Sequence, residues 1–393
     1  MKNKNFPRHG RLKVQTKASA VWGLFFKVLG LVLGASVAIS GIAFAELSNT
    51  IKANGIVLAG STKITEADLA GPINLLLVGS DTREGQGEGF GNDTSVLADV
   101  IILLHVSADR KYATAMSFPR DLLVPWPACP STSTPPGPGY LPQSLGQINA
   151  TIANGGPGCT LLTVEKLTGL KIPYLAMIDF KGVIEMSNAI GGVEVCVAQP
   201  IHDEYTYLDL EAGTHTLQGR DALKFLRTRH GVGDGSDLSR ISNQQVFLTS
   251  LVRKVKSAGV LGNPIYLYSL ATAAARNMKL SESLTNVNVM VAMAGALKDV
   301  ELDKMVFLQV PSRGGLPAPY SGRVAPIYET ANIIFEKLQK DEPLVLAGAN
   351  GGQGAIVASP APSASPSPSV SSSVEALPDS VVGTSADTKT CSN

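Results

Sequence analysis

Runs of apolar residues separated by polar turns outline a folded body in the middle of the chain. "INLLLVGSD" (73–81), "DVIILLHVS" (99–107) and "YATAMSFP" (112–119) are short and rich in branched apolar side chains, which predicts three strands. Strand and helix patterns then alternate, which predicts an α/β layered domain over residues 73–346. The next expected elements are helices over 147–156, 159–169 and 181–192, and strands over 174–180 and 193–198.

The stretch "ALKFLRTRHGVGDGSDLSRISNQQ" (222–245) contains an apolar run, a Gly/Asp loop and the start of a long helix, and it carries three arginines. If the apolar run is a strand, Arg227 and Arg229 share one face about 7 Å apart, a spacing that suits a polyanion. If it is a helix over 219–229, the two side chains lie roughly 200° apart and do not share a face. Both interpretations stay open. Arg240 is expected to begin the following helix, where the helix dipole favours an anion.

The N-terminal region separates positive charge from hydrophobicity. Its charged residues are all basic up to the first acidic residue, Glu46, and residues 28–45 form an eighteen-residue run without a charge. Such a run can cross a bilayer, and the positive-inside rule places residues 1–27 in the cytoplasm and the body outside the cell membrane. The competing interpretation is a signal peptide cleaved after "AFA" (43–45). Both interpretations predict an extracytoplasmic body, which follows a linker over residues 46–72.

Composition changes again toward the C-terminal end of the sequence. "SPAPSASPSPSVSSS" (359–373) is too poor in large apolar residues to bury a core, and residues 347–393 are therefore predicted to be a disordered tail. Over the whole chain the formal net charge is only +1, and no nucleic-acid-binding motif stands out. Nucleic acid is thus excluded as an expected partner.

The four cysteines indicate disulfides rather than a metal site. None belongs to a Cys-x-x-Cys pair or has a histidine at ligand spacing, and an exported body allows disulfides to form. Cys129 lies in a Pro/Ser/Gly-rich loop, and its expected partner is Cys159. Cys196 is the less favoured partner because it can be a core residue of the strand "VEVCVA". Cys391 is expected to be free or to pair between chains.

Four motifs follow one another between residues 73 and 251. They include "NLLLVGSDTR", "LADVIILLHVSADRKYATAMSFPRDLLV", "GQINATIANGGPGCTLLTVEKLTGLKIPYLAMIDF" and "LRTRH…GDGSDLSRISNQQ". Together they resemble the LytR-CpsA-Psr family of bacterial cell-envelope phosphotransferases. The resemblance implies a three-layer α-β-α sandwich with a mixed sheet and an N-terminal transmembrane helix. It also implies transfer of a phosphate-linked glycan from a polyprenyl diphosphate carrier to a peptidoglycan hydroxyl, so that the carrier-linked glycan, peptidoglycan and the membrane are the expected partners.

The charged residues of these motifs fit that chemistry. A diphosphate must be neutralised, and arginine offers a planar, bidentate fork where lysine offers only a point charge. Carboxylates are the hard ligands that Mg²⁺ prefers, and the family's motifs place this ion at Asp81 and Asp99. The resemblance assigns catalysis to Asp81, Arg83, Asp99, Arg120 and Asp121, and diphosphate binding to Arg83, Arg120, Arg227, Arg229, Arg240 and Gln244.

Departures from the family pattern leave alternatives open. The triplet Leu-Ala-Asp ending at Asp99 stands where members commonly have Arg-Ser-Asp, and Asn243 stands where they have a second arginine. Asp93, in a Gly-rich insertion, competes with Asp99 as a metal ligand, and Asp93 and Asp121 are both candidates for the general base. With water as acceptor, the same site would be a polyprenyl diphosphate hydrolase. The missing arginines and the Ser/Pro-rich tail also suit a non-catalytic wall-binding scaffold.

Overall fold

The computed structural model describes residues 17–56, 58, 69–82, 96–131, 137–256, 263–348, 352–358 and 375–393. The chain divides into an N-terminal unit, Met1–Asn49, and a body, Thr50–Asn393. Helix α1 covers Lys17–Ala53. Within the residues described, no helix combines the length and the apolarity that a membrane span requires. The span over 28–45 stays a prediction from the sequence.

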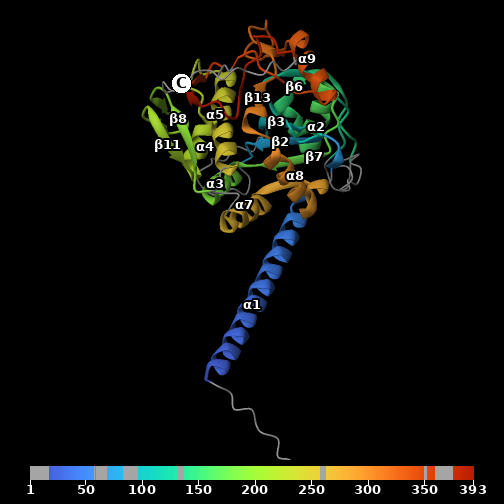
Figure 1. Cartoon of the computed structure of the whole chain (residues 1–393). Helices are drawn as coiled ribbons and strands as arrows, with labels where there is room; N and C mark the ends of the chain where they lie inside the picture. Colours follow the sequence, from blue (N-terminus) through green and yellow to red (C-terminus); the bar gives the residue numbers. More distant parts are fainter. Residues whose placement is uncertain are drawn as a thin grey trace, which may run out of the picture. The chain divides into compact units, whose positions relative to one another are not determined.

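A mixed sheet of eight described strands forms the centre of the body (Figure 1). Strands β2, β3 and β4 are antiparallel neighbours, whereas β7 is parallel to β2 and β13 is parallel to β4. The predicted α/β fold with a mixed sheet is confirmed. Part of the predicted linker over 46–72 instead forms the edge strand β1, parallel to β12. In order across the sheet, the strands are β1 (Gly55–Ile56), β12 (Met278–Ser281), β7 (Tyr174–Ile178), β2 (Ile73–Ser80), β3 (Ala98–Val106), β4 (Ala113–Phe118), β13 (Met305–Gln309) and β17 (Gly383–Ser385).

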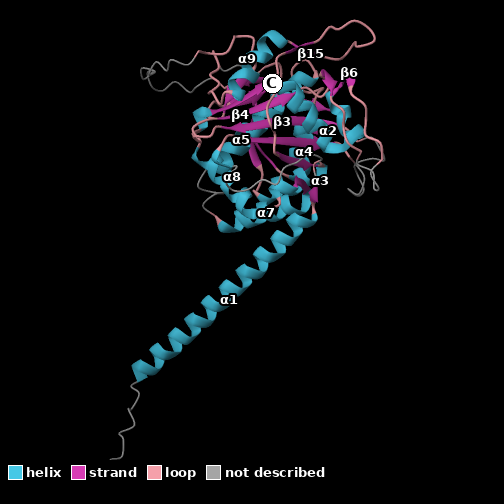
Figure 2. Ribbon diagram, turned by 90° about the vertical axis from the view of Figure 1, so that its right-hand side faces the viewer, coloured by secondary structure: helices cyan, strands magenta, loops and turns pink. Residues whose placement is uncertain are grey.

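Helices cover both faces of this sheet (Figures 1 and 2). Leu76 and Val78 of β2 belong to the main hydrophobic core, together with side chains of α2 and α9. Since neighbouring side chains of a strand point to opposite faces, Leu77 and Gly79 face the other way, into a pocket lined by four helices. The helices are α2 (Thr151–Thr168) and α9 (Tyr328–Gln339) on the first face, and α3 (Phe180–Ala189), α4 (Gly219–Arg227), α5 (Asp237–Lys256) and α7 (Pro264–Asn277) on the second.

A smaller four-stranded sheet packs beside α4 and α5. Its inward side chains join Phe225 of α4 and Phe247 of α5 in a second hydrophobic core. Strand β8 is central and pairs antiparallel with β11 and parallel with β18. Its strands are β11 (Gly213–Leu217), β8 (Val193–Val197), β18 (Thr390–Ser392) and β16 (Ala355–Val357). Short described elements elsewhere are β9 (Ile201–Asp203), β10 (Leu208–Leu210), β5 (Leu123–Trp126), β6 (Gln143–Gln147), β14 (Ser312–Arg313), β15 (Ala325–Pro326), α8 (Val287–Asp299), and the 3₁₀ turns Ile148–Ala150, Glu282–Leu284 and Leu302–Lys304.

The prediction of a disordered tail after residue 346 is wrong for residues 352–358 and 375–393. These two segments supply β16, β17 and β18, so the tail extends the main sheet and completes the smaller one. Backbone hydrogen bonds of the two sheets hold these segments, and they bury Val381 and Ala386. The prediction failed because the Ser/Pro-rich stretch over 359–373 separates two segments that form strands. This stretch itself lies outside the described residues.

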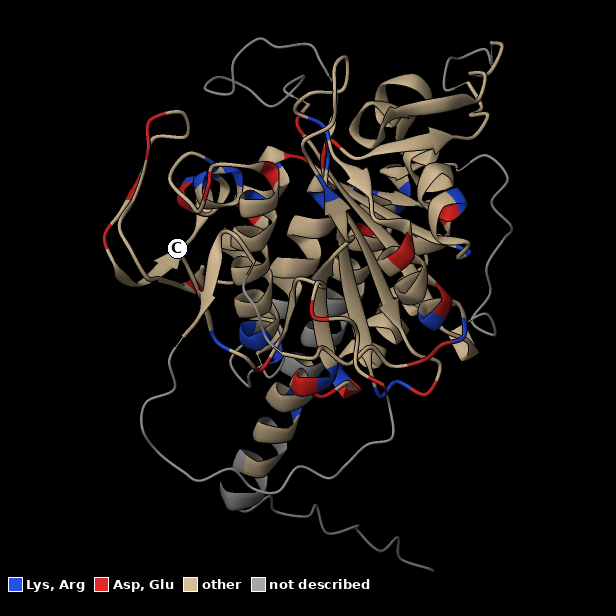
Figure 3. Ribbon diagram, turned by 90° about the horizontal axis from the view of Figure 1, so that it is seen from above, with Lys and Arg blue, Asp and Glu red and all other residues tan. Residues whose placement is uncertain are grey.

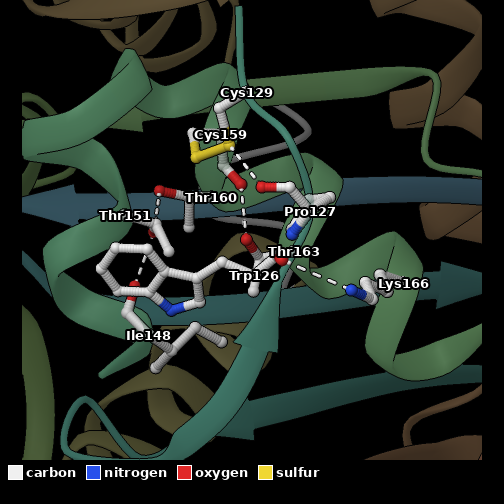
Figure 4. Close-up of a disulfide and its surroundings, with 9 residues drawn as sticks. All are labelled: Trp126, Pro127, Cys129, Ile148, Thr151, Cys159, Thr160, Thr163 and Lys166. Carbon is white, nitrogen blue, oxygen red and sulfur yellow. Dashed lines mark hydrogen bonds between the residues drawn. A yellow bond between two sulfur atoms is a disulfide. The ribbon is translucent and has the colours of Figure 1, made fainter. Parts of the chain in front are cut away.

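One of the two disulfides was predicted from the sequence, and the other was not. The Cys129–Cys159 disulfide is confirmed, and it closes the Pro-rich loop onto α2 (Figure 4). Gly155 makes room for it, because a Cβ there would lie 2.9 Å from Cys129 Cβ. The expectation of an unpaired or intermolecular Cys391 is wrong: it bonds to Cys196 across the register of β18 and β8. A sequence separation of 195 left no local signal for this pairing.

Candidate functional site

Asp81 and Asp99 lie at the same end of two antiparallel strands. Asp81 follows the last residue of β2, and Asp99 is the second residue of β3. The Leu97 amide donates a hydrogen bond of 2.6 Å to Asp81 Oδ1, and the Asp81 amide donates one of 3.1 Å to the Leu97 carbonyl. The sheet register thus places the two predicted metal ligands beside each other. Arg83 and Asp93 lie outside the described residues.

Arg120 connects three carboxylates at this end of the sheet. It follows β4, which ends where the antiparallel β3 begins, and its Nη1 lies 2.6 Å from Asp99 Oδ1. Its Nε lies 3.6 Å from Asp121 Oδ2 and 3.8 Å from Asp237 Oδ1, and its main-chain amide donates to Asp237 Oδ2. Burial by itself lowers the pKa of Arg120, but the three carboxylates together outweigh it and raise that pKa. Arg120 is thus a permanent cation in this cluster.

Arg240 lies in the first turn of α5 and is only 4% exposed. Its Nη2 lies 2.5 Å from Asp237 Oδ1, as an ion pair without good hydrogen-bond geometry, and donates a 3.1 Å hydrogen bond to the Asp99 carbonyl. Burial lowers the pKa of Arg240, Asp237 and Asp99 oppose that effect, and the neighbouring Arg120 and Arg229 lower the pKa further. Several guanidinium groups therefore repel one another around one spot, which an anion would relieve.

Three arginine side chains at this spot have an unused donor. The Nε atoms of Arg120, Arg229 and Arg240 are buried and lack a hydrogen-bond partner in the described part of the protein. A buried donor without a partner costs about 1–3 kcal/mol, and more when it is charged. An anion bound between the arginines would remove this cost. Elsewhere on the body, basic residues are interspersed with acidic ones rather than forming one positive face (Figure 3).

The structure corrects the strand interpretation of Arg227 and Arg229. Helix α4 ends at Arg227, and the next residue, Thr228, is extended (φ −59°, ψ 140°), so the chain changes direction between the two arginines. The Arg227 guanidinium carbon lies 4.4 Å above the ring centre of Phe180. The positive charge of Arg229 instead acts on Arg240, whose pKa it lowers.

Asp203 holds this change of direction in place, and sequence reasoning missed it. Its Oδ2 accepts hydrogen bonds from Thr228 Oγ1 and from the amides of Arg229 and His230, at 3.0 and 3.3 Å for the two amides. Its Oδ1 accepts from the amides of Tyr205 and Thr206. The carboxylate is 1% exposed, and these hydrogen bonds lower the pKa of Asp203 against the opposing effect of burial. Its only sequence signal was an aspartate at the end of a short strand.

Gln244 and Asn243 of α5 donate hydrogen bonds to main-chain carbonyls of α4. Gln244 Nε2 donates to the Leu226 carbonyl at 3.0 Å, and Asn243 Nδ2 donates to the Phe225 carbonyl at 2.7 Å. Asn243 Oδ1 also accepts from Ser392 Oγ of the C-terminal strand. Asn243, where the family pattern has arginine, therefore has a structural role here, whereas Gln244 lines the pocket beside Arg240.

Asp121 is fixed by two polar neighbours. Its Oδ1 accepts from Gln147 Nε2 at 2.8 Å and from Arg323 Nη1 at 3.1 Å. Its side chain is 14% exposed. The position fits a residue that orients Arg120, whose Nε is near its other carboxylate oxygen.

A largely apolar pocket of about 210 Å³ opens beside the arginine cluster. Its polar lining includes Asp99, Arg227, Arg240 and Gln244. Gly79 also lines this pocket, and a Cβ at this position would lie only 2.9 Å from Val100 Cβ. The apolar lining comes from the sheet and from α3, α4, α5 and α7, and includes Leu77, Ile102, Ile178, Phe180, Val183, Met186, Ile190, Val193, Leu223, Leu226, Phe247, Leu248, Leu251, Leu270 and Met278.

The LytR_cpsA_psr family model matches residues 43–336. The chain belongs to this family. Among curated family relatives, the "Probable cell wall biosynthesis protein LcpB" of Corynebacterium glutamicum is 33% identical over 230 residues, 56% of this chain and 51% of that protein. The "Cell wall biosynthesis protein LcpA" of the same organism is 27% identical over 326 residues, 76% of this chain and 62% of that protein. The chain therefore spans about half of the first relative's length and less than two thirds of the second's.

A more distant relative carries a more specific name. The "Polyisoprenyl-teichoic acid--peptidoglycan teichoic acid transferase TagT" of Bacillus subtilis is 27% identical over 312 residues, 77% of this chain and 88% of that protein.

Solved structures of the LytR_cpsA_psr family share the fold. A "LytR-Csp2A-Psr enzyme from Actinomyces oris" aligns with a TM-score of 0.53 and 24% identity, over 72% of this chain and 94% of that one. A structure described as "TagT bound to LIIa-WTA" aligns with a TM-score of 0.52 and 23% identity, over 72% of this chain and 98% of that one. At these identities the likeness establishes the common fold.

Proposed function

We propose that the protein transfers a phosphate-linked glycan from a polyprenyl diphosphate carrier to a hydroxyl of peptidoglycan. One observation carries the proposal: among the described residues the buried Nε donors of Arg120, Arg229 and Arg240 have no hydrogen-bond partner, and Arg240 also lines an apolar pocket. A ligand that satisfies both features must have a multiply charged anionic group joined to a long apolar chain. A polyprenyl diphosphate has this composition.

The apolar pocket takes the lipid in this proposal. Its walls belong to the sheet and to four helices, so the pocket is part of the folded scaffold. Arg240 lines the pocket, which supports binding of the diphosphate at the arginine cluster and of the lipid along the apolar walls. Arg227, held against Phe180, is a further cation at the pocket lining.

The carboxylates present fit the Mg²⁺ ion that the family resemblance implies. Asp81 and Asp99 offer hard oxygen ligands from adjoining strand ends, although Asp99 Oδ1 is already bound by Arg120. We propose that these two residues would hold the ion beside the diphosphate. When bound, the ion would offset negative charge on the diphosphate.

The proposed reaction is a phosphoryl transfer in which arginine side chains stabilise the developing charge. The acceptor hydroxyl forms a bond to the sugar-linked phosphorus, and the bond from that phosphorus to the bridging oxygen of the carrier breaks. Polyprenyl phosphate leaves with the bonding electron pair, and the hydroxyl proton is lost to a base. Arg120, Arg229 and Arg240 stabilise the charge that develops on the phosphoryl oxygens, where one well-placed donor contributes about 3–4 kcal/mol.

Two features imply that the proposed reaction takes place at a membrane: the lipid carrier and the N-terminal sequence. A polyprenyl diphosphate is anchored in a bilayer by its lipid. The basic residues before Glu46 and the uncharged run over 28–45 support a single-pass anchor with the body on the extracytoplasmic side, where peptidoglycan lies.

A reconstituted transfer assay tests this function. Purified protein is incubated with Mg²⁺, a fluorescent glycan on a polyprenyl diphosphate of defined length, and peptidoglycan sacculi freed of secondary polymers. We expect the label to become covalently attached to the sacculi, with one polyprenyl phosphate released for each glycan transferred. Release of glycan phosphate into solution without attachment would identify a hydrolase. Donor binding without turnover would support a scaffold instead.

A further inference from the structure

The turn between β9 and β10 carries two uncovered aromatic rings, and one of them packs on the residue that follows Arg229. Tyr205 is 78% exposed and Tyr207 is 82% exposed, and both lie in the tip of this hairpin. Tyr207 has a φ of 54°, a left-handed conformation that is unfavourable for a bulky residue. Two large apolar surfaces facing water on one rigid turn are typical of a binding surface.

The hairpin contacts the segment that carries Arg229 through a ring contact and through hydrogen bonds to Asp203. The Tyr205 ring stacks on His230, with ring centres 4.3 Å apart and the planes inclined by 36°. Asp203 accepts the Tyr205 amide with one carboxylate oxygen and the Arg229 and His230 amides with the other. Tyr205 is therefore held against His230, one residue beyond Arg229 of the proposed diphosphate site, and Tyr207 lies two residues further along the same turn.

The chemistry of this surface suits a carbohydrate. Tyrosine rings pack against the C–H faces of sugar rings, and their hydroxyls can hydrogen-bond to sugar hydroxyls. Two acidic residues lie beside them, on either side of the exposed His202: Glu204 is 86% exposed and Asp209 is 81% exposed. These carboxylates can accept hydrogen bonds from hydroxyl and amide groups, but they repel a phosphate-rich polymer.

We propose that Tyr205, Tyr207 and His230 form a platform that binds the glycan strand of peptidoglycan, the acceptor. This inference rests on the proposed function and specifies where its second substrate lies. The basic site takes the diphosphate of the donor, while the acidic surroundings of the platform favour the acceptor over a polyanionic donor glycan. A sugar bound on the platform would present its hydroxyl toward the phosphorus held near Arg229.

Binding and kinetics of the full chain test the platform. The variants are Tyr205→Ala with Tyr207→Ala, and Tyr205→Phe, which keeps the ring. Tyr328→Ala is the matched control, since Tyr328 is 46% exposed on α9, at the opposite face of the sheet. The two readouts are co-sedimentation with purified sacculi in the absence of donor, and the KM values for acceptor and donor.

We expect the double alanine variant to bind sacculi at least tenfold more weakly and to raise the acceptor KM by a similar factor, with an unchanged donor KM. Tyr328→Ala should behave as the parent. Tyr205→Phe, which keeps the ring but loses a hydroxyl, should weaken sacculus binding less than the double alanine variant does. Unchanged sacculus binding and acceptor KM would overturn the platform, and so would a rise confined to the donor KM. Because the co-sedimentation needs no turnover, a protein that lacks transferase activity but loses sacculus binding on substitution would refute the proposed function and not the platform.

Discussion

Arg240 Nη2 lies 2.5 Å from Asp237 Oδ1, and both side chains are more than nine-tenths buried at the start of α5. Arg240 is therefore a structural residue as well as a proposed ligand for the diphosphate. Removing one partner of a buried ion pair leaves the other charge uncompensated. Because of this ion pair, an experiment on Arg240 must measure stability and activity separately.

Arg240→Ala should lower both stability and activity. We expect the free energy of unfolding to fall by about 3 kcal/mol, because Asp237 loses its main counter-charge. At a matched folded fraction, the transfer rate should fall by about 10²–10³. Denaturant unfolding and initial rates give the two numbers.

The double variant Arg240→Ala with Asp237→Asn separates these effects. It removes the uncompensated carboxylate and keeps an acceptor for the Arg120 amide, so it should regain most of the stability and none of the activity. If the double variant regained the parent's rate, Arg240 would have no role in the reaction.

Arg229→Lys should impair transfer with little change in stability. The Arg229 Nε is buried without a partner in the described structure, so lysine loses no internal hydrogen bond at that atom. Lysine keeps the charge but not the fork that binds two phosphate oxygens. A roughly tenfold or greater loss in kcat/KM, corresponding to about 1.4 kcal/mol, is expected from steady-state kinetics. An unchanged kcat/KM would show that charge alone is sufficient at this position.

Metal removal should abolish transfer if Asp81 and Asp99 hold Mg²⁺. Chelation followed by titration with Mg²⁺ should restore activity in the parent. Asp81→Asn and Asp99→Asn should each require at least tenfold more Mg²⁺, because an amide is a weaker ligand than a carboxylate for this ion. Asp109→Asn serves as a control, since Asp109 pairs with Lys111 in the exposed turn after β3. Full activity in the chelated parent would exclude the metal.

Asp203 should make stability depend on pH at the acidic end. Its pKa is lowered in the fold from the ordinary value of 3.8, so its contribution is complete well above pH 3.8 and is lost as the pH falls below 3.8 through the lower folded pKa. Asp203→Asn should cost about 1–3 kcal/mol at pH 7, because an amide cannot accept all five hydrogen bonds. The difference from the parent should shrink as the pH drops below 3.8. A pH-independent difference in denaturant midpoints would contradict this account.

Blocking the apolar pocket should prevent lipid binding without disturbing the arginines. Val183 lines the pocket from α3, and Val183→Trp would fill much of its volume. We expect at least a tenfold loss in affinity for the polyprenyl diphosphate donor, measured with vesicle-bound carrier. Lys181→Trp, on an exposed position of the same helix, should bind normally. Normal donor binding by Val183→Trp would place the lipid elsewhere.

The sequence by itself determined the features that depend on local pattern. Apolar runs of strand length predicted β2, β3 and β4. The arginine-rich motif supplied the residues of the polyanion site that we propose. Cys129 and Cys159 could be paired because both flank one loop. In each case the deciding interactions lie within a short stretch of chain or within one motif.

Only the tertiary structure decided the contacts between distant segments. Residues 390–392 enter the smaller sheet beside β8, which pairs Cys391 with Cys196 and brings Ser392 to Asn243. Asp203 could not be recognised from sequence, because its five donors come from two segments about 25 residues apart. A backbone donor carries no side-chain signature, and a strand partner is defined by register rather than by composition. These contacts therefore leave little trace in a single sequence, although they fix the positions of the arginines.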